Sequence, residues 1–158
     1  MDFDSPLSRL LEEPGSSEDS HTFTFDVTPD DSLEAGTQVA IGIQGRAGSE
    51  IGCEKVLTVT VGQEFGASMS LSKSRLSNVE PGTSGTLSIQ ITNQGNGQET
   101  MALGTSGVPP GWQVSFSQST VTLGSSQSSN NKETVSVDIF VPEDASAESD
   151  TVISFTVG

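Results

Sequence analysis

Residues 107–116 read GVPPGWQVSF and give the clearest structural signal in the chain. A Pro-Pro-Gly run is typical of a rigid turn, because proline fixes its own φ and glycine tolerates conformations that other residues avoid. After the turn, Trp112, Val114 and Phe116 alternate with polar residues, which places three large side chains on one face of a β-strand. We therefore expect a turn that leads into a half-buried strand, with Trp112 as a core anchor.

The same alternation of apolar and polar residues recurs along the chain, whereas helical periodicity is nearly absent. Turn residues separate the alternating segments at intervals typical of an all-β sandwich. Glycine-rich residues 45–52 and Ser/Asn-rich residues 124–132 are expected to be loops. The expected strands are Thr22–Val27, Thr37–Ile43, Lys55–Val61, Phe65–Leu71, Thr86–Thr92, Thr100–Thr105, Trp112–Phe116, Thr120–Leu123, Thr134–Val141 and Thr151–Val157.

The composition agrees with a small sandwich that has a thin core. The chain has 158 residues, of which 32% are hydrophobic and 5% aromatic. Residues 65–158 match the size of one immunoglobulin-like domain. The fold class predicted from the sequence is therefore an all-β, immunoglobulin-like antiparallel β-sandwich.

An internal similarity suggests how the chain is organised. Residues 22–31 resemble residues 135–144, since in both an alternating segment runs into proline and two acidic residues. We therefore interpret residues 21–62 as the C-terminal strands of a partial module and 63–158 as a second module that lacks its last strand. Residues 1–20 are expected to be an acidic, disordered tail.

On this interpretation the sequence is a fragment of a longer array, so Met1 does not report the cellular location. An alternative is that Lys55–Val61 or its neighbours fill the vacant edge of the second module, since an unpaired edge strand promotes aggregation.

The charge excludes some classes of partner. The net charge is −15, from 21 acidic and six basic residues. Such a surface repels nucleic acid and anionic lipid, because binding to phosphates needs clustered Lys and Arg. The acidity can serve solubility or reflect adaptation to salty surroundings, where salt screens the repulsion. The sequence contains no run of apolar residues long enough to span a membrane.

Few residues have the chemistry of a site. His21 is the single histidine, which gives no support for a catalytic triad, and Cys53 is the single cysteine, so an internal disulfide is impossible. Clustered carboxylates could supply calcium ligands, although the spacing of a calcium-binding loop is absent and solvated acidic turns are the simpler interpretation. Calcium is the only metal considered, and no cofactor is expected. The candidate calcium ligands are Asp30, Asp31, Glu143, Asp144 and Asp150.

Trp112 also has an alternative interpretation. Exposed aromatic side chains often stack on sugars, so a tryptophan after a turn could form a carbohydrate-binding platform. Its alternation with Val114 and Phe116 favours burial instead.

Three segments together resemble a known family. They are residues 87–96 (LSIQITNQGN), 108–112 (VPPGW) and 140–145 (FVPEDA). These resemble the NEW3 family, the immunoglobulin-like domains associated with alpha-galactosidases and NPCBM domains, and its CARDB-like relatives share the strand and turn at 91–96. The resemblance covers about residues 65–158, plus a partial copy at 21–62. The chain departs from the family pattern at residues 148–150 and in the loop after Leu123, which leaves the subfamily open.

The resemblance implies an extracytoplasmic, non-catalytic module in a bacterial or archaeal surface or secreted protein. We therefore expect a structural spacer whose partners are neighbouring modules of the same longer chain. The alternative is an accessory adhesion module that binds carbohydrate or a surface protein through loops at one end of the sandwich. No residue pattern supports an enzyme, and no catalytic residue carries over from the family.

Overall fold

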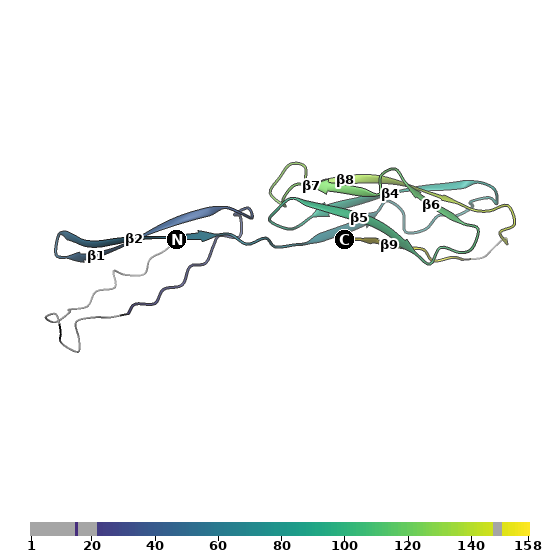
Figure 1. The fold of residues 1–158 in the computed structure, drawn as a ribbon. Coiled ribbons are helices and arrows are strands. Elements are labelled where there is room, and N and C mark those ends of the chain that lie inside the picture. The colour runs from purple at the N-terminus through teal and green to yellow at the C-terminus, as the bar shows by residue number, and fades with distance from the viewer. Residues whose placement is uncertain (1–14, 16–21, 147–149) are drawn as a thin grey trace. The chain divides into compact units, whose positions relative to one another are not determined.

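The computed structural model describes residue 15 and residues 22–146 and 150–158. The described residues divide into two units, the first of which ends at Asp31 and the second of which begins at Ser32. All nine strands of the described residues belong to the second unit, and every pairing between them is antiparallel. The protein is thus an all-β protein, as the sequence predicted (Figure 1).

The first two strands form a two-stranded sheet of their own. Strands β1 (Gln38–Ala47) and β2 (Glu50–Thr60) pair from Gln38↔Thr60 to Ala47↔Glu50, around a two-residue turn. A bulge follows Gly45. The strands continue into residues 45–52 because a two-residue turn needs only Gly48 and Ser49, so the expectation of a longer glycine-rich loop there is wrong.

The other seven strands form two sheets of a sandwich. One sheet has the order β3-β4-β8-β6 and the other the order β7-β5-β9. The strands are β3 (Ala67–Leu71), β4 (Ser84–Asn93), β5 (Glu99–Ser106), β6 (Gln113–Phe116), β7 (Thr120–Leu123), β8 (Lys132–Phe140) and β9 (Ser154–Val157).

Both sheets contribute to one apolar core. Within the sandwich the longest pairing joins β4 and β8, whose inward residues are fully or almost fully buried. Alternation along each strand sends every second side chain into the space between the sheets. The core consists of Leu87, Ile89, Ile91, Met101, Val121, Leu123, Val135, Val137 and Ile139.

The strand at Thr22–Val27 was predicted wrongly, because the structure forms no strand at residues 22–31. Phe23 and Phe25 are 44% and 42% exposed. Alternation indicates only that a segment could offer an apolar face. A strand also needs a neighbouring strand that forms hydrogen bonds with its backbone N–H and C=O groups. The disorder expected for residues 1–20 lies outside the described residues, apart from Gly15.

Candidate functional site

The turn before Trp112 has the geometry that its sequence predicted. The backbone N–H of Trp112 donates to the carbonyl oxygen of Pro109 at 3.2 Å, and Gly111 has a φ of 83°. A positive φ of this size is strained for residues with a side chain, which explains glycine at this position. The turn delivers Trp112 to the start of β6.

Trp112 is half-buried and packs against the apolar core, as do Val114 and Phe116 on the same face. The ring of Phe116 meets that of Phe155 on β9 edge to face, with centroids 6.3 Å apart. This geometry is one of the arrangements that aromatic pairs prefer. Trp112 therefore acts as a core anchor, although its burial is incomplete.

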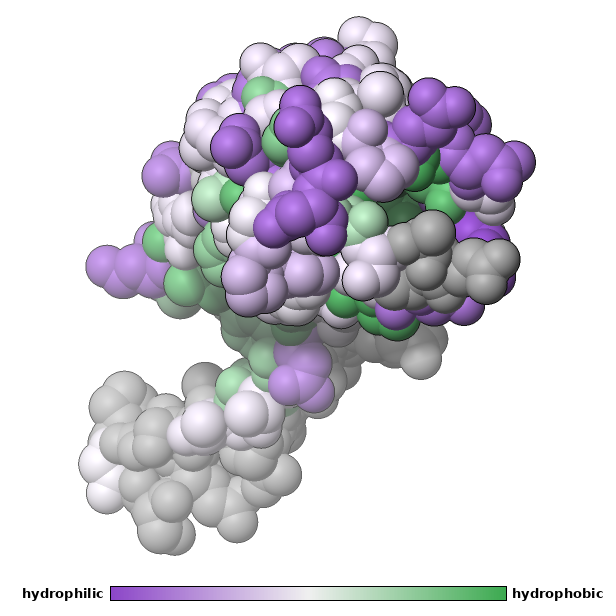
Figure 2. Space-filling view, turned by 90° about the vertical axis from the view of Figure 1, so that its right-hand side faces the viewer, coloured by the Kyte–Doolittle hydropathy of each residue, from purple (hydrophilic) through white to green (hydrophobic). Residues whose placement is uncertain are grey.

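Trp112 also lines a cavity of about 1120 Å³. Its walls include the apolar side chains of Leu71, Leu76 and Val152 and the charged side chains of Lys73 and Arg75. Figure 2 shows hydrophobic surface in a hollow between hydrophilic residues. A hollow with an aromatic wall and polar edges has the general character of a small-molecule site.

One ion pair lies at this cavity. Arg75 Nη2 is 2.7 Å from Asp150 Oδ1, and the two side chains are 70% and 85% exposed. Solvent screens such a pair, so it contributes little to stability. Both groups are consequently accessible to a polar ligand.

A second cluster of polar groups surrounds the turn between β4 and β5. Asn93 is fully buried. Its Nδ2 donates to the carbonyl oxygens of Gly97 and Gly124, at 2.8 and 2.9 Å, and its Oδ1 accepts from the N–H of Gly95 at 2.8 Å. Buried polar groups cost free energy unless they are paired, and Asn93 pairs three backbone groups at once.

Asn96 in the same turn holds the segment that connects β2 to β3. Its Nδ2 donates to Gly62 O at 3.0 Å, and its Oδ1 accepts from the N–H of Glu64 at 2.8 Å. Its backbone oxygen accepts from the N–H of Ala35 at 3.0 Å. Nearby, the buried Ser125 donates its hydroxyl to Glu34 Oε1 at 2.8 Å. We call residues 62–66 together with the turn 93–97 the junction.

The candidate calcium ligands do not assemble. Within residues 22–146 and 150–158, no three Asp, Glu, His or Cys side chains gather closely enough to hold a metal ion. Their positions differ: Asp30 and Asp31 belong to the first unit, Glu143 and Asp144 are exposed after β8, and Asp150 pairs with Arg75. The structure therefore leaves these acids as exposed carboxylates.

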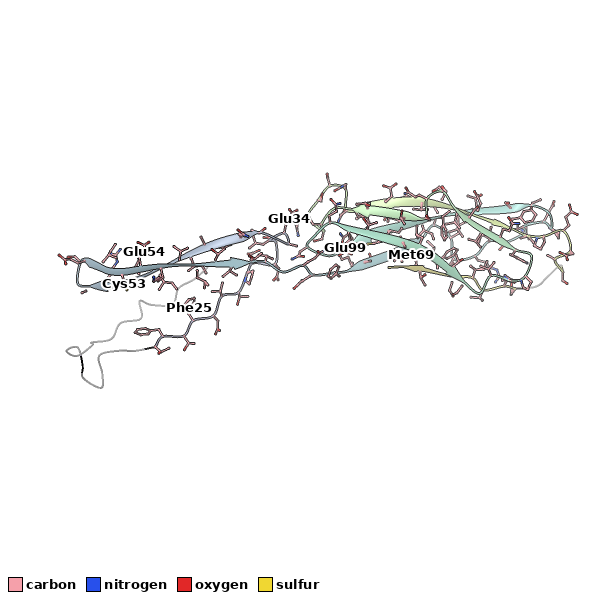
Figure 3. The ribbon with its side chains drawn as sticks, viewed as in Figure 1. Phe25, Glu34, Cys53, Glu54, Met69 and Glu99 are labelled. Carbon is pink, nitrogen blue, oxygen red and sulfur yellow. The ribbon has the colours of Figure 1, made fainter. Side chains whose placement is uncertain are left out.

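Two other residues singled out from the sequence offer no site. His21 lies outside the described residues. Cys53 is an exposed free thiol on β2 (Figure 3).

The sequence reasoning missed Asn93, Asn96 and Glu99 as structural polar residues. A signal for the first two was available, because an Asn-x-Gly-Asn turn favours side chains that bond to nearby backbone. The partners of Asn93 and Asn96 at Gly124 and Gly62 lie more than 30 residues away in the sequence, so only the fold reveals them.

Comparison with protein-family models, with curated proteins and with solved structures found no match to this chain. Among the described residues, no helix is long and apolar enough to cross a membrane.

Proposed function

We propose that this chain is a non-catalytic structural module, an immunoglobulin-like spacer within a larger cell-surface or secreted protein. Its partners would be neighbouring modules of the same longer chain. The cell-surface or secreted setting is supported by the resemblance to the NEW3 domains of residues 87–96, 108–112 and 140–145. The acidic surface, with a net charge of −15, is compatible with an exposed location and with exclusion of nucleic acid.

The observation that carries the proposal is the set of hydrogen bonds made by Asn96. A spacer has to hold neighbouring modules in a fixed orientation. A linker that makes no contacts with the modules acts instead as a flexible hinge. The side chain of Asn96 forms hydrogen bonds with Gly62 and with Glu64, so it contacts the connecting segment at two points. Gln94 adds a backbone bond to Gly66 O at 2.8 Å. These contacts support a stiff connection between β2 and β3.

The internal similarity of the sequence supports a repeated architecture. The segment that becomes β1 resembles the segment that becomes β9, and each follows a proline and two acidic residues. β9 pairs with β5 inside the sandwich, while β1 pairs with β2. On the proposed organisation, β1 and β2 are the last two strands of a preceding module.

Backbone ¹⁵N relaxation, measured by nuclear magnetic resonance, tests whether the connection between β2 and β3 is stiff. We expect amides of the β1–β2 sheet and of the sandwich to report the same overall tumbling. Asn96→Ala should give the β1–β2 sheet faster independent motion, because the two side-chain bonds across the junction are lost. Asn130→Ala, an exposed asparagine in the loop after β7, should leave the tumbling unchanged. Independent motion of the β1–β2 sheet in the unmodified protein would refute a rigid spacer.

The location is tested separately. Antibodies raised against this chain should label intact cells of the source organism without permeabilisation, or detect the protein in the medium. Labelling that requires permeabilisation would contradict a surface or secreted role, whatever the relaxation data show.

A second candidate function is carbohydrate or protein binding, and the cavity beside Trp112 favours it. An aromatic wall in a cavity of about 1120 Å³ with charged groups at its edge suits a sugar. A glycan array probed with the unmodified protein and with Trp112→Phe tests this function. Binding that the substitution weakens would support an adhesion module, and no binding by either protein would favour the spacer.

A further inference from the structure

Strand β9 has one paired edge and one open edge. It pairs with β5 and is the end strand of the order β7-β5-β9. Gly158 and Ala102 exchange two backbone hydrogen bonds, of 2.8 and 3.1 Å. Successive residues of an antiparallel strand direct their backbone groups to opposite sides, so those of Phe155 and Val157 point away from β5. Within the part of the chain that the structure describes, no strand pairs with that side of β9.

Two cavities separate β9 from β3, which is the end strand of the other sheet. The larger, of about 1120 Å³, is lined by Leu71 of β3, by Phe155 of β9 and by the core residue Leu87. The smaller, of about 620 Å³, is lined by Ala67 of β3 and by Gly158, which directly follows β9. We call these two cavities, together with the edges of β3 and β9 beside them, the seam. The seam therefore opens onto the apolar core of the sandwich.

Large apolar side chains along the seam are exposed. Phe65 is 76% exposed, Leu71 41% and Val152 81%, and each of them lines one of the two cavities. Apolar side chains that gather on a surface mark interaction sites, whereas single scattered ones do not. An open strand edge beside an apolar groove suits an added β-strand, because the edge supplies backbone hydrogen bonds and the groove takes alternate side chains. The seam has both parts of such a site.

Positive charge is concentrated at one end of the seam. Lys73 and Arg75 line the larger cavity, and they are two of the six basic residues of the chain. Arg75 pairs with Asp150, which precedes β9, whereas Lys73 has no ion-pair partner among the described residues. A strand antiparallel to β9 would have its C-terminal end here. This end of the seam therefore favours an acidic group near the C-terminal end of an added strand.

We propose that the seam binds an extended segment of another polypeptide chain as an added strand, antiparallel to β9. The segment has apolar side chains at alternate positions, which enter the seam, and an acidic group near its C-terminal end, which meets Lys73. A sugar does not fit this site equally well, because it lacks the regular backbone amides that pair with a strand edge. The proposal goes beyond the spacer function and does not depend on it, since binding is measured on this chain alone.

The β1–β2 pairing provides a template for the added strand. The sequence of β1 resembles that of β9, with Ile41 in the place of Phe155. β1 pairs antiparallel with β2, and Leu57 of β2 is opposite Ile41. A segment with the sequence of β2 should therefore pair with β9 so that Leu57 is opposite Phe155.

The probe is a synthetic peptide of residues 54–64, EKVLTVTVGQE, added to the ¹⁵N-labelled full chain. Its apolar residues Leu57, Val59 and Val61 alternate, and Glu64 and the terminal carboxylate supply the acidic end. We expect the amide resonances of Phe155 and Val157 to shift, and these amides to exchange more slowly with solvent, because their N–H groups acquire partners. The shifts as a function of peptide concentration give the dissociation constant.

Two N-methylated forms of the peptide are matched controls. Because Phe155 directs its backbone groups to the open edge, the N–H of Leu57 should point toward β9 and that of Thr58 away from it. A methyl group on the nitrogen of Leu57 should therefore weaken binding by about tenfold or more. The same group on the nitrogen of Thr58 should change binding by less than about twofold.

Lys73→Gln and Lys132→Gln are the matched variants of the protein. Both lysines are exposed, and Lys132, at the start of β8, lines neither cavity of the seam. Lys73→Gln should weaken binding about two- to fivefold, as expected for the loss of an exposed ion pair. Lys132→Gln removes the same charge and should leave the dissociation constant unchanged.

The outcomes separate this site from the alternatives. Shifts confined to β1 would mean that the peptide replaces β2, and an absence of shifts at about 1 mM peptide would mean that the edge binds no such strand. Either result overturns the proposal, as does an equal loss of binding from both methyl groups. If the amides of Phe155 and Val157 also shift when the chain alone is concentrated, a second copy supplies the added strand, which supports the proposal.

Discussion

The side-chain nitrogen of Asn93 donates a 2.9 Å hydrogen bond to the carbonyl oxygen of Gly124, which lies just beyond the end of β7. A fully buried polar side chain thereby connects the end of β4 in one sheet to a residue that follows the other sheet. Asn93 and Gly124 are 31 positions apart. Their bond means that closure of this end of the sandwich depends on one amide group.

Asn93→Ala should destabilise the protein strongly. The substitution leaves the carbonyl oxygens of Gly97 and Gly124 and the N–H of Gly95 without their partner. Each buried unpaired group costs about 1–3 kcal/mol, and partial relaxation or water entry should reduce the total to about 3 kcal/mol. Urea unfolding followed by circular dichroism measures the change. Gln127→Ala, at an exposed position, should cost less than about 0.5 kcal/mol, and an equal loss in both variants would contradict the argument.

Trp112→Ala tests whether the tryptophan is chiefly a core anchor. Because the ring packs against the core but is only half-buried, we expect a loss of about 2–4 kcal/mol, slightly below the range for fully buried aromatics. Trp112→Phe should cost less, since it keeps a ring in the same place. Circular dichroism has to follow unfolding, because the substitution removes the single tryptophan. A loss below about 0.5 kcal/mol would instead indicate a side chain kept for binding.

The strand positions were largely predictable from local alternation. Thr120–Leu123 was predicted with the bounds that β7 has, and the core residues of β4 were the apolar half of an alternating segment. Alternation reports one buried face, which is the main determinant of a sandwich strand. The error at Thr22–Val27 has the same origin, because alternation cannot tell whether a neighbouring strand is available.

The polar features of the site were less predictable, because they depend on contacts between distant segments. Glu99 is one acidic residue among 21, and nothing local distinguishes it from the exposed ones. Its buried oxygen becomes visible only when the turn at Gly95 and the backbone of Glu64 are brought beside it. In contrast, the acids that the sequence singled out cluster along the chain but do not converge in space.

Salt should stabilise the protein through general screening. A net charge of −15 produces self-repulsion that is greatest in the compact state. Raising the ionic strength from about 0.01 to about 0.15 M shortens the screening length from about 30 to about 8 Å. We therefore expect the unfolding midpoint to rise by several degrees in differential scanning calorimetry. Tetramethylammonium chloride should match sodium chloride, because screening does not depend on the cation, and a fall in the midpoint would contradict the argument.

Amide hydrogen exchange should reveal a gradient along the β1–β2 sheet. A sheet of two strands is marginally stable by itself, so its protection depends on what its ends contact. At the base, Val61 bonds to both Gly36 and Thr37 at 2.9 Å and is 8% exposed, and Ile41 is 5% exposed. Toward the turn, Val56 and Ile51 are 66% and 51% exposed.

Protection factors should therefore fall from Ile41 toward Gly48, and they should stay highest at the β4–β8 pairing, where Ile89 and Val135 face each other with no exposed surface. Exchange followed by nuclear magnetic resonance resolves each amide, and the β4–β8 amides serve as the internal reference. Asn96→Ala should reduce protection at the base of β1 and β2 without affecting β4–β8, because it removes only the junction bonds to Gly62 and Glu64. Uniform protection along β1 and β2, equal to that of β4, would mean that the two-stranded sheet has a source of stability other than its base.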